Sequence, residues 1–313
     1  MTADENLPAT APESAELPTI ALLGTGNMNG AILTGLTRPG AGPAEPVRVT
    51  ARSEASAERL RALPRTAAAA LETDPGANRA AVDGAGIVVV GTKPAMVPGV
   101  LADIADALAP GAVVISIAAG VETATMAASL PAHARIVRAM PNTPATIGLG
   151  VTGIAAGRGA DAEAMALARA VFESVGSVLE VDEALIPAIG AASGSGPAHV
   201  YLLIERMIEA TERVGLDADA AADLVIENFR GAVEMVRADR EAGPAELRRR
   251  VTSPNGTTER SIAVLEEAGL AELFTRSLEA NIARSRELAR EAADPADPAD
   301  PVGPAGPAAP AQR

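Results

Sequence analysis

The sequence predicts an α/β domain built on a parallel sheet, followed by an all-helical domain. Residues 18–181 alternate short β-branched runs with helix-like segments, which is the pattern of parallel strands joined by helical crossovers. From Glu183 to Arg290 the strand patterns disappear and long helical periodicities replace them. The chain has 313 residues, 48% of them hydrophobic but only 1% aromatic, which is enough for two domains with aliphatic cores.

The elements follow from the order of these patterns. Six apolar runs bounded by glycine, proline or polar residues are expected to form the sheet: 19–24, 46–52, 86–92, 112–118, 134–140 and 176–181. Five helical stretches are expected after the sheet: 184–214, 218–239, 245–250, 258–268 and 271–292. The domains are therefore expected at 18–181 and 182–291. Proline-containing tails at 1–17 and 292–313 are expected to be disordered.

Composition and charge argue against several classes of function. The formal net charge of −14 repels phosphate backbones, so a nucleic-acid partner is not expected. The chain has no Cys, and His133 and His199 are its only histidines, so neither a disulfide framework nor a metal site is expected. The longest apolar runs are too short to span a membrane, and the N-terminus lacks a secretory pattern. We therefore expect a soluble, cytoplasmic protein with no membrane partner.

A glycine-rich turn follows the first predicted strand. In IALLGTGNMNGAILTGL the chain turns at Gly24 and Gly26 and enters a helix near Asn27. Such a turn lets the backbone approach a pyrophosphate, and the helix start offers N–H groups to it. The third glycine of the fingerprint would fall at Asn29, and a G-x-G alone is a weak signal. We expect a Rossmann-type dinucleotide site, with a merely structural tight turn as the alternative.

The end of the second strand indicates which dinucleotide binds. NAD enzymes usually place Asp or Glu here, whereas VRVTARSEA ends in Arg52 and Ser53. Arg52 can pair with a 2′-phosphate, and Ser53 can hydrogen-bond to it. The sequence therefore favours NADPH, with NADH possible. The alternative is that Arg52 is an ordinary solvated arginine.

Further candidate cofactor residues follow the later strands. Lys93 is the only lysine among 26 Lys and Arg residues. It precedes Pro94 at the carboxyl end of a strand, which favours a role at the cofactor edge over chance retention on the surface. Ala118 and Ala119 end the next strand and would let a nicotinamide ribose lie close to the backbone, although a turn that needs small residues explains each of them equally well. Asn142 follows the strand after that and is expected near the nicotinamide.

Two stretches of small residues precede helices of the second domain. VTSPNGTTER combines the hydroxyls of Ser253, Thr257 and Thr258 with a helix start, which makes an anion cup that suits a small carboxylate. Thr257 or Thr258 followed by Glu259 is expected to cap this helix, and an ordinary capped helix start is the alternative. SGSGP at 193–197 opens the long helix, where capping and close packing explain the residues as well as binding does.

The predicted helices carry apolar faces that one chain has little to cover. One face contains Val200, Leu203, Ile204, Met207 and Ile208. We therefore expect an obligate dimer.

Seven motifs carry a resemblance to a known family. GTGNM, TARS, GTKP, SIAAGV, AMPNTPATIGLGVTGI, SGSGPAHVYLLIE and VTSPNGTT occur in the order and spacing of pyrroline-5-carboxylate reductases. The chain resembles that family from Ile20 to Leu288, and the last two motifs are specific to it. The resemblance implies reduction of 1-pyrroline-5-carboxylate to L-proline with NADPH or NADH, the last step of proline biosynthesis. It also implies a homodimer through interleaved helical domains, with the substrate loop completed across the dimer, and dimers grouped into a homodecamer.

The motifs and the resemblance together assign site residues. The expected cofactor-binding residues are Gly24, Thr25, Gly26, Asn27, Met28, Asn29, Arg52, Ser53, Asn78, Thr92, Lys93, Pro94, Ala118, Ala119 and Asn142. The expected substrate-binding residues are Glu183, Glu241, Ser253, Asn255, Gly256, Thr257 and Thr258. By resemblance, Asn78 would lie beside the adenosine and Thr258 would approach the ring nitrogen of the substrate.

Three positions depart from the family pattern. Asn255 stands where Gly is common, but Asn also adopts the left-handed conformation, so the loop shape is expected to survive. His199 stands where an aromatic residue is usual, and Arg250 stands where some members have an Asn that contacts the cofactor. These departures bear on cofactor affinity and loop geometry more than on the reaction.

The reaction asks mainly for positioning. A protonated cyclic imine is already electrophilic and the cofactor carries the hydride, so no histidine, cysteine or lysine base is needed. We expect the Thr258 hydroxyl to orient the ring nitrogen and to deliver or retain its proton. A 3-hydroxyacid dehydrogenase or imine reductase shares this domain order, but the hydroxyacid enzymes use a lysine in the helical domain, where this chain has none. A catalytically silent NADP-binding protein is the alternative from another class.

Overall fold

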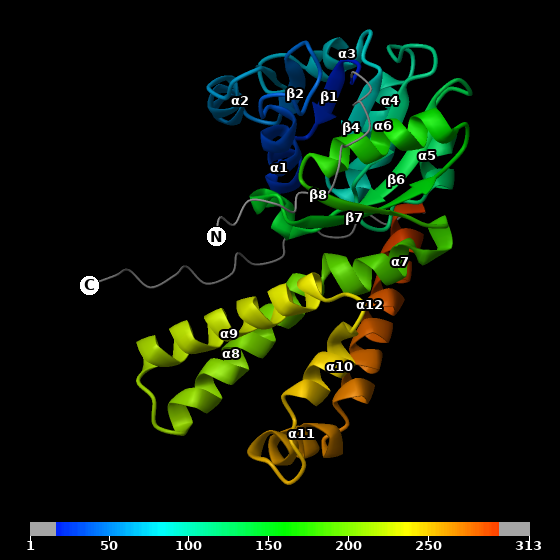
Figure 1. The fold of residues 1–313 in the computed structure, drawn as a ribbon. Helices are drawn as coiled ribbons and strands as arrows, with labels where there is room; N and C mark the ends of the chain where they lie inside the picture. The colour runs from blue at the N-terminus through cyan, green and yellow to red at the C-terminus, as the bar shows by residue number, and fades with distance from the viewer. Residues whose placement is uncertain (1–16, 294–313) are drawn as a thin grey trace.

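The computed structural model describes residues 17–293, which form a sheet domain and a helical domain (Figure 1). The sheet has the order β3-β2-β1-β4-β5-β6-β7-β8, and each neighbouring pair is parallel except β6 and β7. The strands are β1 Ile20–Leu23, β2 Val47–Ala51, β3 Thr66–Ala70, β4 Ile87–Val90, β5 Val113–Ser116, β6 Arg135–Met140, β7 Gly150–Ala156 and β8 Gly176–Glu180. The predicted α/β domain followed by helices is confirmed.

Two strands and one pairing were not expected from the sequence pattern. β3 reads TAAAA and β7 reads GVTGIAA, and alanine and glycine are poor strand formers that give no clear alternation. The connection from β6 to β7 contains only the short helix η2, Thr143–Ile147. A parallel pair needs a longer crossover, so β7 runs antiparallel to β6.

The core of the sheet domain lies on both faces of the sheet. Ile20 and Leu22 of β1 belong to one cluster, whereas the alternate residues Ala21 and Leu23 belong to the other. The first cluster includes residues of α1 and α6, and the second includes residues of α3, α4 and α5. The helices are α1 Asn27–Leu36, α2 Glu54–Arg61, α3 Ala77–Val82, η1 Pro94–Met96, α4 Val97–Ile104, α5 Thr123–Ser129 and α6 Ala162–Glu173.

The predicted tails lie outside the described residues, except at their inner ends. Leu17, the last residue of the predicted N-terminal tail, is 8% exposed and packs in the first core cluster, so the sheet domain contains one residue more than predicted. At the other end the last helix continues to Ala293.

The helical domain extends away from the sheet domain as two arms, with α8 and α9 in one and α10 and α11 in the other (Figure 1). From α11, the long helix α12 runs back to the sheet domain. The elements are η3 Glu183–Leu185, α7 Ile186–Ile189, η4 Gly190–Gly194, α8 Gly196–Arg213, α9 Ala218–Ala238, α10 Gly243–Arg250, α11 Thr257–Glu267 and α12 Leu270–Ala293.

The helical domain buries very little within one chain. From α8 through residue 290, Ala221 and Val225 are the only buried hydrophobic residues in the described structure. Val200, Leu203 and Met207 of the predicted apolar face are 40–47% exposed. The helices therefore have no core of their own and present apolar side chains for another surface to cover.

The predicted continuous helix over 184–214 is interrupted. The turn η4, Gly190–Gly194, is π-helical and leads into α8. A Cβ atom at Gly194 would lie 2.8 Å from the terminal methyl group of Met140, so glycine lets this turn approach β6 closely. The interruption places Ser193 beside the end of the sheet, where it meets Asn142.

Of the helices within residues 17–293, none is long and apolar enough to cross a membrane.

Candidate active site

The glycine turn after β1 has the geometry of a phosphate-binding turn. Gly24 has φ +74°, and a Cβ atom there would lie 2.5 Å from Thr92 Cγ2, so only glycine fits. Gly24 N donates to Thr50 Oγ1 at 3.2 Å and Thr25 N donates to Thr50 O at 2.9 Å, which fixes the turn against β2. Gly26 is the N-cap of α1, no side chain caps the helix, and a Cβ atom at Gly26 would meet nothing within 4 Å. The first turn of α1 is thus open to a ligand.

Asn29 replaces the third glycine of the fingerprint without loss of close packing. It is 1% exposed, and its Nδ2 donates to Leu23 O at 3.1 Å and to Gly24 O at 3.3 Å. Space for it comes from Gly91, where a Cβ atom would lie 2.5 Å from Asn29 Nδ2. In this chain the glycine that permits close packing is therefore Gly91, after β4, and not a residue of α1.

Buried polar atoms without partners gather at this turn. Across residues 17–293 they are Thr25 Oγ1, Asn29 Oδ1 and Thr92 Oγ1. Buried polar groups are normally hydrogen-bonded, so three orphaned atoms around one turn point to a polar ligand. Together with the uncapped start of α1, they fit the pyrophosphate and ribose groups of a dinucleotide.

The expected adenosine end lies beyond β2. Arg52 is exposed, and its side chain has no hydrogen bond or ion pair within the described chain. Ser53 Oγ donates to Ser56 Oγ at 3.0 Å. Nearby, a Glu72 carboxylate oxygen accepts from Glu54 N at 3.0 Å, at the start of α2. A cation and hydroxyls therefore stand at this edge together with the carboxylates of Glu54 and Glu72.

Asn78 contributes to the support of the turn. It is 5% exposed, and its Oδ1 accepts from Thr50 Oγ1 at 2.8 Å, while Thr50 Oγ1 in turn accepts from Gly24 N. Thr50 is fully buried and was not singled out from the sequence. In the sequence, the only sign of this role was that Thr50 places a hydroxyl near the end of the second predicted strand. The predicted contact of Asn78 with adenosine stays a prediction.

The remaining predicted cofactor residues lie at the same edge of the sheet. Lys93 is exposed and precedes Pro94, the first residue of η1. Ala118 is buried and Ala119 is exposed after β5. Asn142 is 7% exposed and clamps neighbouring segments: its Nδ2 donates to Ser193 O at 3.1 Å and its Oδ1 accepts from Val151 N at 2.8 Å.

The hydroxyl-rich loop before α11 is open and specifically shaped. Asn255 has φ +60°, which confirms that it takes the left-handed conformation expected of a glycine substitute. A Cβ atom at Gly256 would lie 2.9 Å from the backbone oxygen of Ser253, so glycine is needed for this bend. The hydroxyls of Ser253, Thr257 and Thr258 have no hydrogen-bond partner in residues 17–293.

The predicted cap of α11 is wrong. The N-cap residue is Gly256, and no side chain caps the helix. Glu259 instead reaches back, and its Oε2 accepts from Asn255 N at 2.7 Å. The bend at Gly256 places the threonines inside the first turn, so their hydroxyls and the first N–H groups both remain available.

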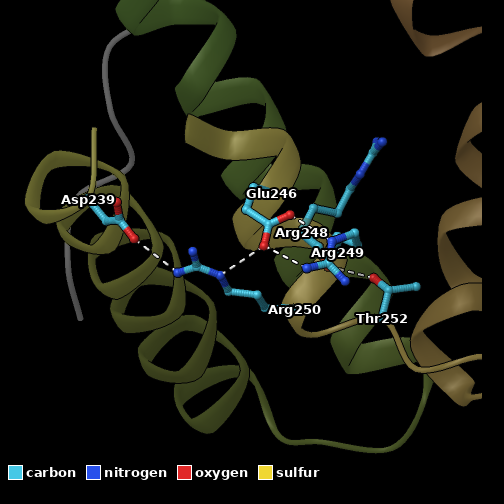
Figure 2. A network of polar contacts seen from close by, with 6 residues as sticks. All are labelled: Asp239, Glu246, Arg248, Arg249, Arg250 and Thr252. Carbon is cyan, nitrogen blue, oxygen red and sulfur yellow. Dashed lines mark hydrogen bonds and ion pairs between the residues drawn. The ribbon is translucent and has the colours of Figure 1, made fainter. Parts of the chain in front are cut away.

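A network of ion pairs braces this loop (Figure 2). Arg250 bonds to Asp239 at 2.9 Å and to Glu246 at 3.1 Å, and Arg249 bonds to Glu246 at 2.6 Å. Hydrogen bonds from Arg249 and then Arg250 lower the pKa of Glu246 to about 2. Thr252 Oγ1 donates to Arg248 O at 2.7 Å. Arg250, which departs from the family pattern, therefore ties the end of α10 to the end of α9.

The structure separates the predicted substrate residues. Glu241 is exposed in the turn between α9 and α10. Glu183 lies at the junction of the domains, where its carboxylate contacts Thr123 and Arg138. Neither Thr123 nor Arg138 was singled out from the sequence, because nothing local marks a partner 45 or 60 residues away.

Within one chain the two halves of the site are far apart. The glycine turn lies at the start of α1 in the sheet domain, whereas the loop at 253–258 joins α10 to α11 at the far end of the helical domain (Figure 1). One copy does not bring the loop to the predicted cofactor edge.

Comparison with known proteins matches both halves of the chain. Residues 183–288 match the family described as pyrroline-5-carboxylate reductase dimerisation, and residues 19–120 match NADP oxidoreductase coenzyme F420-dependent. The chain is 38% identical to a pyrroline-5-carboxylate reductase of Pseudomonas aeruginosa over 275 residues, covering 88% of this chain and 98% of that one. It is also 38% identical to one from Corynebacterium melassecola over 279 residues, covering 88% and 100%.

Solved structures agree in fold. A pyrroline-5-carboxylate reductase from Coxiella burnetii matches with a TM-score of 0.80 and 36% identity, covering 87% of this chain and 99% of that one. A Plasmodium falciparum pyrroline carboxylate reductase with NADP bound matches with a TM-score of 0.75 and 24% identity, covering 87% and 98%. The second likeness bears on the fold alone.

Proposed function

The chain belongs to the pyrroline-5-carboxylate reductases, NAD(P)H-dependent oxidoreductases that reduce 1-pyrroline-5-carboxylate to L-proline, and we propose how its residues divide this work. The cofactor supplies the hydride that reduces the C=N bond. The residues of the sheet domain bind the cofactor, and the loop at 253–258 binds the substrate. The observation that carries this division is that each domain has one open polar site: the glycine turn in the sheet domain and the loop at 253–258 in the helical domain.

The cofactor half is the edge of the sheet at β1, β2, β4 and β5. The uncapped start of α1, with Gly24 to Asn29, holds the pyrophosphate, and the orphaned hydroxyls of Thr25 and Thr92 donate to it. Arg52 and Ser53 hold the 2′-phosphate. The rest of the cofactor, toward its nicotinamide end, is bordered by Lys93, Pro94, Ala118 and Ala119. These residues follow β4 and β5 at the same edge of the sheet as the glycine turn, which supports this placement.

The substrate half is the bend that contains Ser253, Asn255, Gly256, Thr257 and Thr258. Its free hydroxyls and first-turn N–H groups donate hydrogen bonds to the substrate carboxylate, because an uncapped helix start is favourable to an anion. The Thr258 hydroxyl orients the ring nitrogen and retains its proton. Glu241 is exposed in the turn before α10, at the other end of that helix from the loop, so its contact with the substrate stays a prediction of the resemblance.

A complete site needs two copies of the chain. The family match to a dimerisation domain supports a homo-oligomer. The bare apolar faces of α8 and α9, together with the separation of the two halves, support a dimer in which the loop of one copy meets the cofactor edge of the other. Grouping into a homodecamer stays a prediction of the resemblance, and a cytoplasmic location stays a prediction of the sequence pattern.

The direct experiment measures NADPH oxidation with 1-pyrroline-5-carboxylate, repeated with NADH and with the Thr258→Ala and Arg52→Ala variants. The division of work predicts that Arg52→Ala impairs NADPH use selectively and that Thr258→Ala impairs turnover with both cofactors. Equal effects of both changes on both cofactors would contradict it.

A further inference from the structure

Glu183 is the most heavily bonded carboxylate at the junction of the domains. Its Oε1 accepts hydrogen bonds from Thr123 N at 2.7 Å and Arg138 Nη1 at 3.1 Å, and its Oε2 accepts one from Thr123 Oγ1 at 2.6 Å. Arg138 is 4% exposed and Thr123 is 9% exposed. The two contacts with Thr123 are short, all three are charge-assisted, and their donors are shielded from water, while the Glu183 side chain is 28% exposed.

These contacts leave Glu183 little freedom to bind a substrate. Both of its oxygens are engaged, and within the described chain it is the only ion-pair partner of the buried Arg138. If the carboxylate turned away, Arg138 would become an unpaired buried cation, and the first N–H of α5 would lose its acceptor. The geometry therefore favours a fixed carboxylate over one that turns toward a ligand.

The contacts join two segments that matter for the cofactor. Glu183 is the first residue of η3, where the helical domain begins. Thr123 is the first residue of α5 and follows directly on the segment 118–122, which contains Ala118 and Ala119. Glu183 thus takes the place of a missing side-chain cap on α5 and fixes the end of that segment to the start of the helical domain.

The middle of the segment is also held. A Cβ atom at Gly120, which has φ +79°, would lie 3.3 Å from backbone atoms of Leu288 and Ala289 in α12. The segment is therefore enclosed by the sheet, by α12 and by the contacts of Glu183.

We propose that Glu183 is a positioning residue for the cofactor site, acting through Thr123 and Arg138 on the segment 118–122. This role replaces the substrate-binding role that the family resemblance implies for Glu183. The inference rests on the proposed placement of the nicotinamide end of the cofactor at Ala118 and Ala119. Its consequence is that Glu183 affects NADPH binding before any substrate is present.

The test measures NADPH binding to the intact oligomer without substrate, from the change in cofactor fluorescence. Glu183→Gln keeps the side-chain shape but removes the charge, and Thr123→Val removes only the hydroxyl. Each change is expected to raise the Kd for NADPH about tenfold, because each removes a charge-assisted contact. The KM for 1-pyrroline-5-carboxylate should stay within about twofold of the wild-type value.

Companion variants separate positioning from a general loss of structure. Thr123→Ser keeps a hydroxyl and should restore the wild-type Kd. The double variant Glu183→Gln/Thr123→Val should bind NADPH no more weakly than the more impaired of the two single variants, because both changes act on the contact between Glu183 and Thr123 Oγ1. Asp182→Asn changes an exposed neighbouring carboxylate and should leave the Kd unchanged. Light scattering checks that each variant keeps its oligomeric state.

Two outcomes would overturn the inference. A raised KM for 1-pyrroline-5-carboxylate with an unchanged Kd for NADPH in Glu183→Gln would make Glu183 a substrate ligand. Unchanged values for both would leave it no role in the site. The proposed cofactor placement is tested separately. Ala119→Leu adds bulk at an exposed position beside the proposed nicotinamide end, and an unchanged Kd for NADPH in that variant would contradict the placement without bearing on Glu183.

Discussion

At the scale of single residues, polar side chains hold the backbone so that main-chain groups face a ligand. Asn29 fills the place of a glycine because Gly91 makes room for it, and Thr50 fixes the turn at Gly24 from the neighbouring strand. Asn255 takes the left-handed conformation that the loop requires. Both ends of the site therefore present open N–H groups with hydroxyls beside them.

Thr258 gives a prediction for the chemical step. Thr258→Ala should lower kcat about 10- to 100-fold, since one positioned donor is worth about 1.4–2.7 kcal/mol. Steady-state kinetics with saturating NADPH measures this. Thr66→Ala, which removes a hydroxyl at the sheet edge that bonds to Pro64 O, serves as the matched control. Wild-type turnover in Thr258→Ala would refute the role.

Arg52 gives a prediction for cofactor preference. Arg52→Ala should raise the KM for NADPH about tenfold or more and leave the KM for NADH within about twofold, because NADH has no 2′-phosphate for the guanidinium to bind. Glu72→Gln removes a negative charge at the same edge and should lower the KM for NADPH. An equal shift for the two cofactors in Arg52→Ala would place the 2′-phosphate elsewhere.

The residue pattern predicted the glycine turn and the shape of the loop, but not the partners that support them. Gly24 and Asn255 are local backbone positions, so the sequence alone identifies them. Thr50, Thr123 and Arg138 act through contacts with residues far away in the chain, which only the fold brings together. The capping prediction at Thr257 and Thr258 was wrong because the helix begins one residue earlier than expected, at a bend around Gly256.

At the scale of elements, short connections and small residues decide where the site residues lie. The strands that the sequence predicts are those rich in β-branched residues, and β3 was missed because alanine carries no strand signal. The glycines of η4 interrupt the expected helix and bring Ser193 to Asn142. In the helical domain, α10 ends in three arginines, of which Arg248 pairs with α11 and Arg250 with the end of α9.

The brace at the end of α10 gives a prediction for the loop. Because the pKa of Glu246 is lowered from 4.5 to about 2, its stabilising contribution is fully present above pH 4.5 and is lost as the pH falls through about 2. Glu246→Gln mimics the protonated state at pH 7. It should raise the KM for 1-pyrroline-5-carboxylate about twofold to fivefold, a small effect because the pairs are exposed.

The control for this prediction is another exposed glutamate. Glu234→Gln breaks a 3.6 Å pair with Arg237 on α9, away from the loop, and should leave the KM unchanged. Equal changes in both variants would show that surface charge in general, rather than the brace, sets the KM.

At the scale of the whole molecule, the sheet domain is complete in one chain and the helical domain is not. The buried clusters lie in the sheet domain, whereas α10 and α11 have no buried residues in the described structure. The sequence predicted an oligomer from its uncovered apolar faces, and the family match supports one. How the partner copy packs against this one depends on contacts between chains, and no sequence pattern within a single chain specifies those contacts.

Composite sites give a prediction for mixed oligomers. Gly26→Asp places a negative charge at the pyrophosphate turn, where a side chain meets no atoms, and Thr258→Ala disables the loop. If each site uses the turn of one copy and the loop of the other, co-refolding equal amounts of the two variants should recover about a quarter of wild-type activity. Sites built within one chain would show no recovery above the two separate variants.

The bare helices have a consequence for how much of the enzyme must be present. Because their apolar side chains are covered only when copies meet, association and stability are linked by mass action. The melting temperature should therefore fall on dilution, which calorimetry at several protein concentrations measures. At a low concentration of the protein in the cell, a larger fraction would be unassociated and less stable to unfolding. The expression level would then set the lifetime of each molecule as well as the number of molecules.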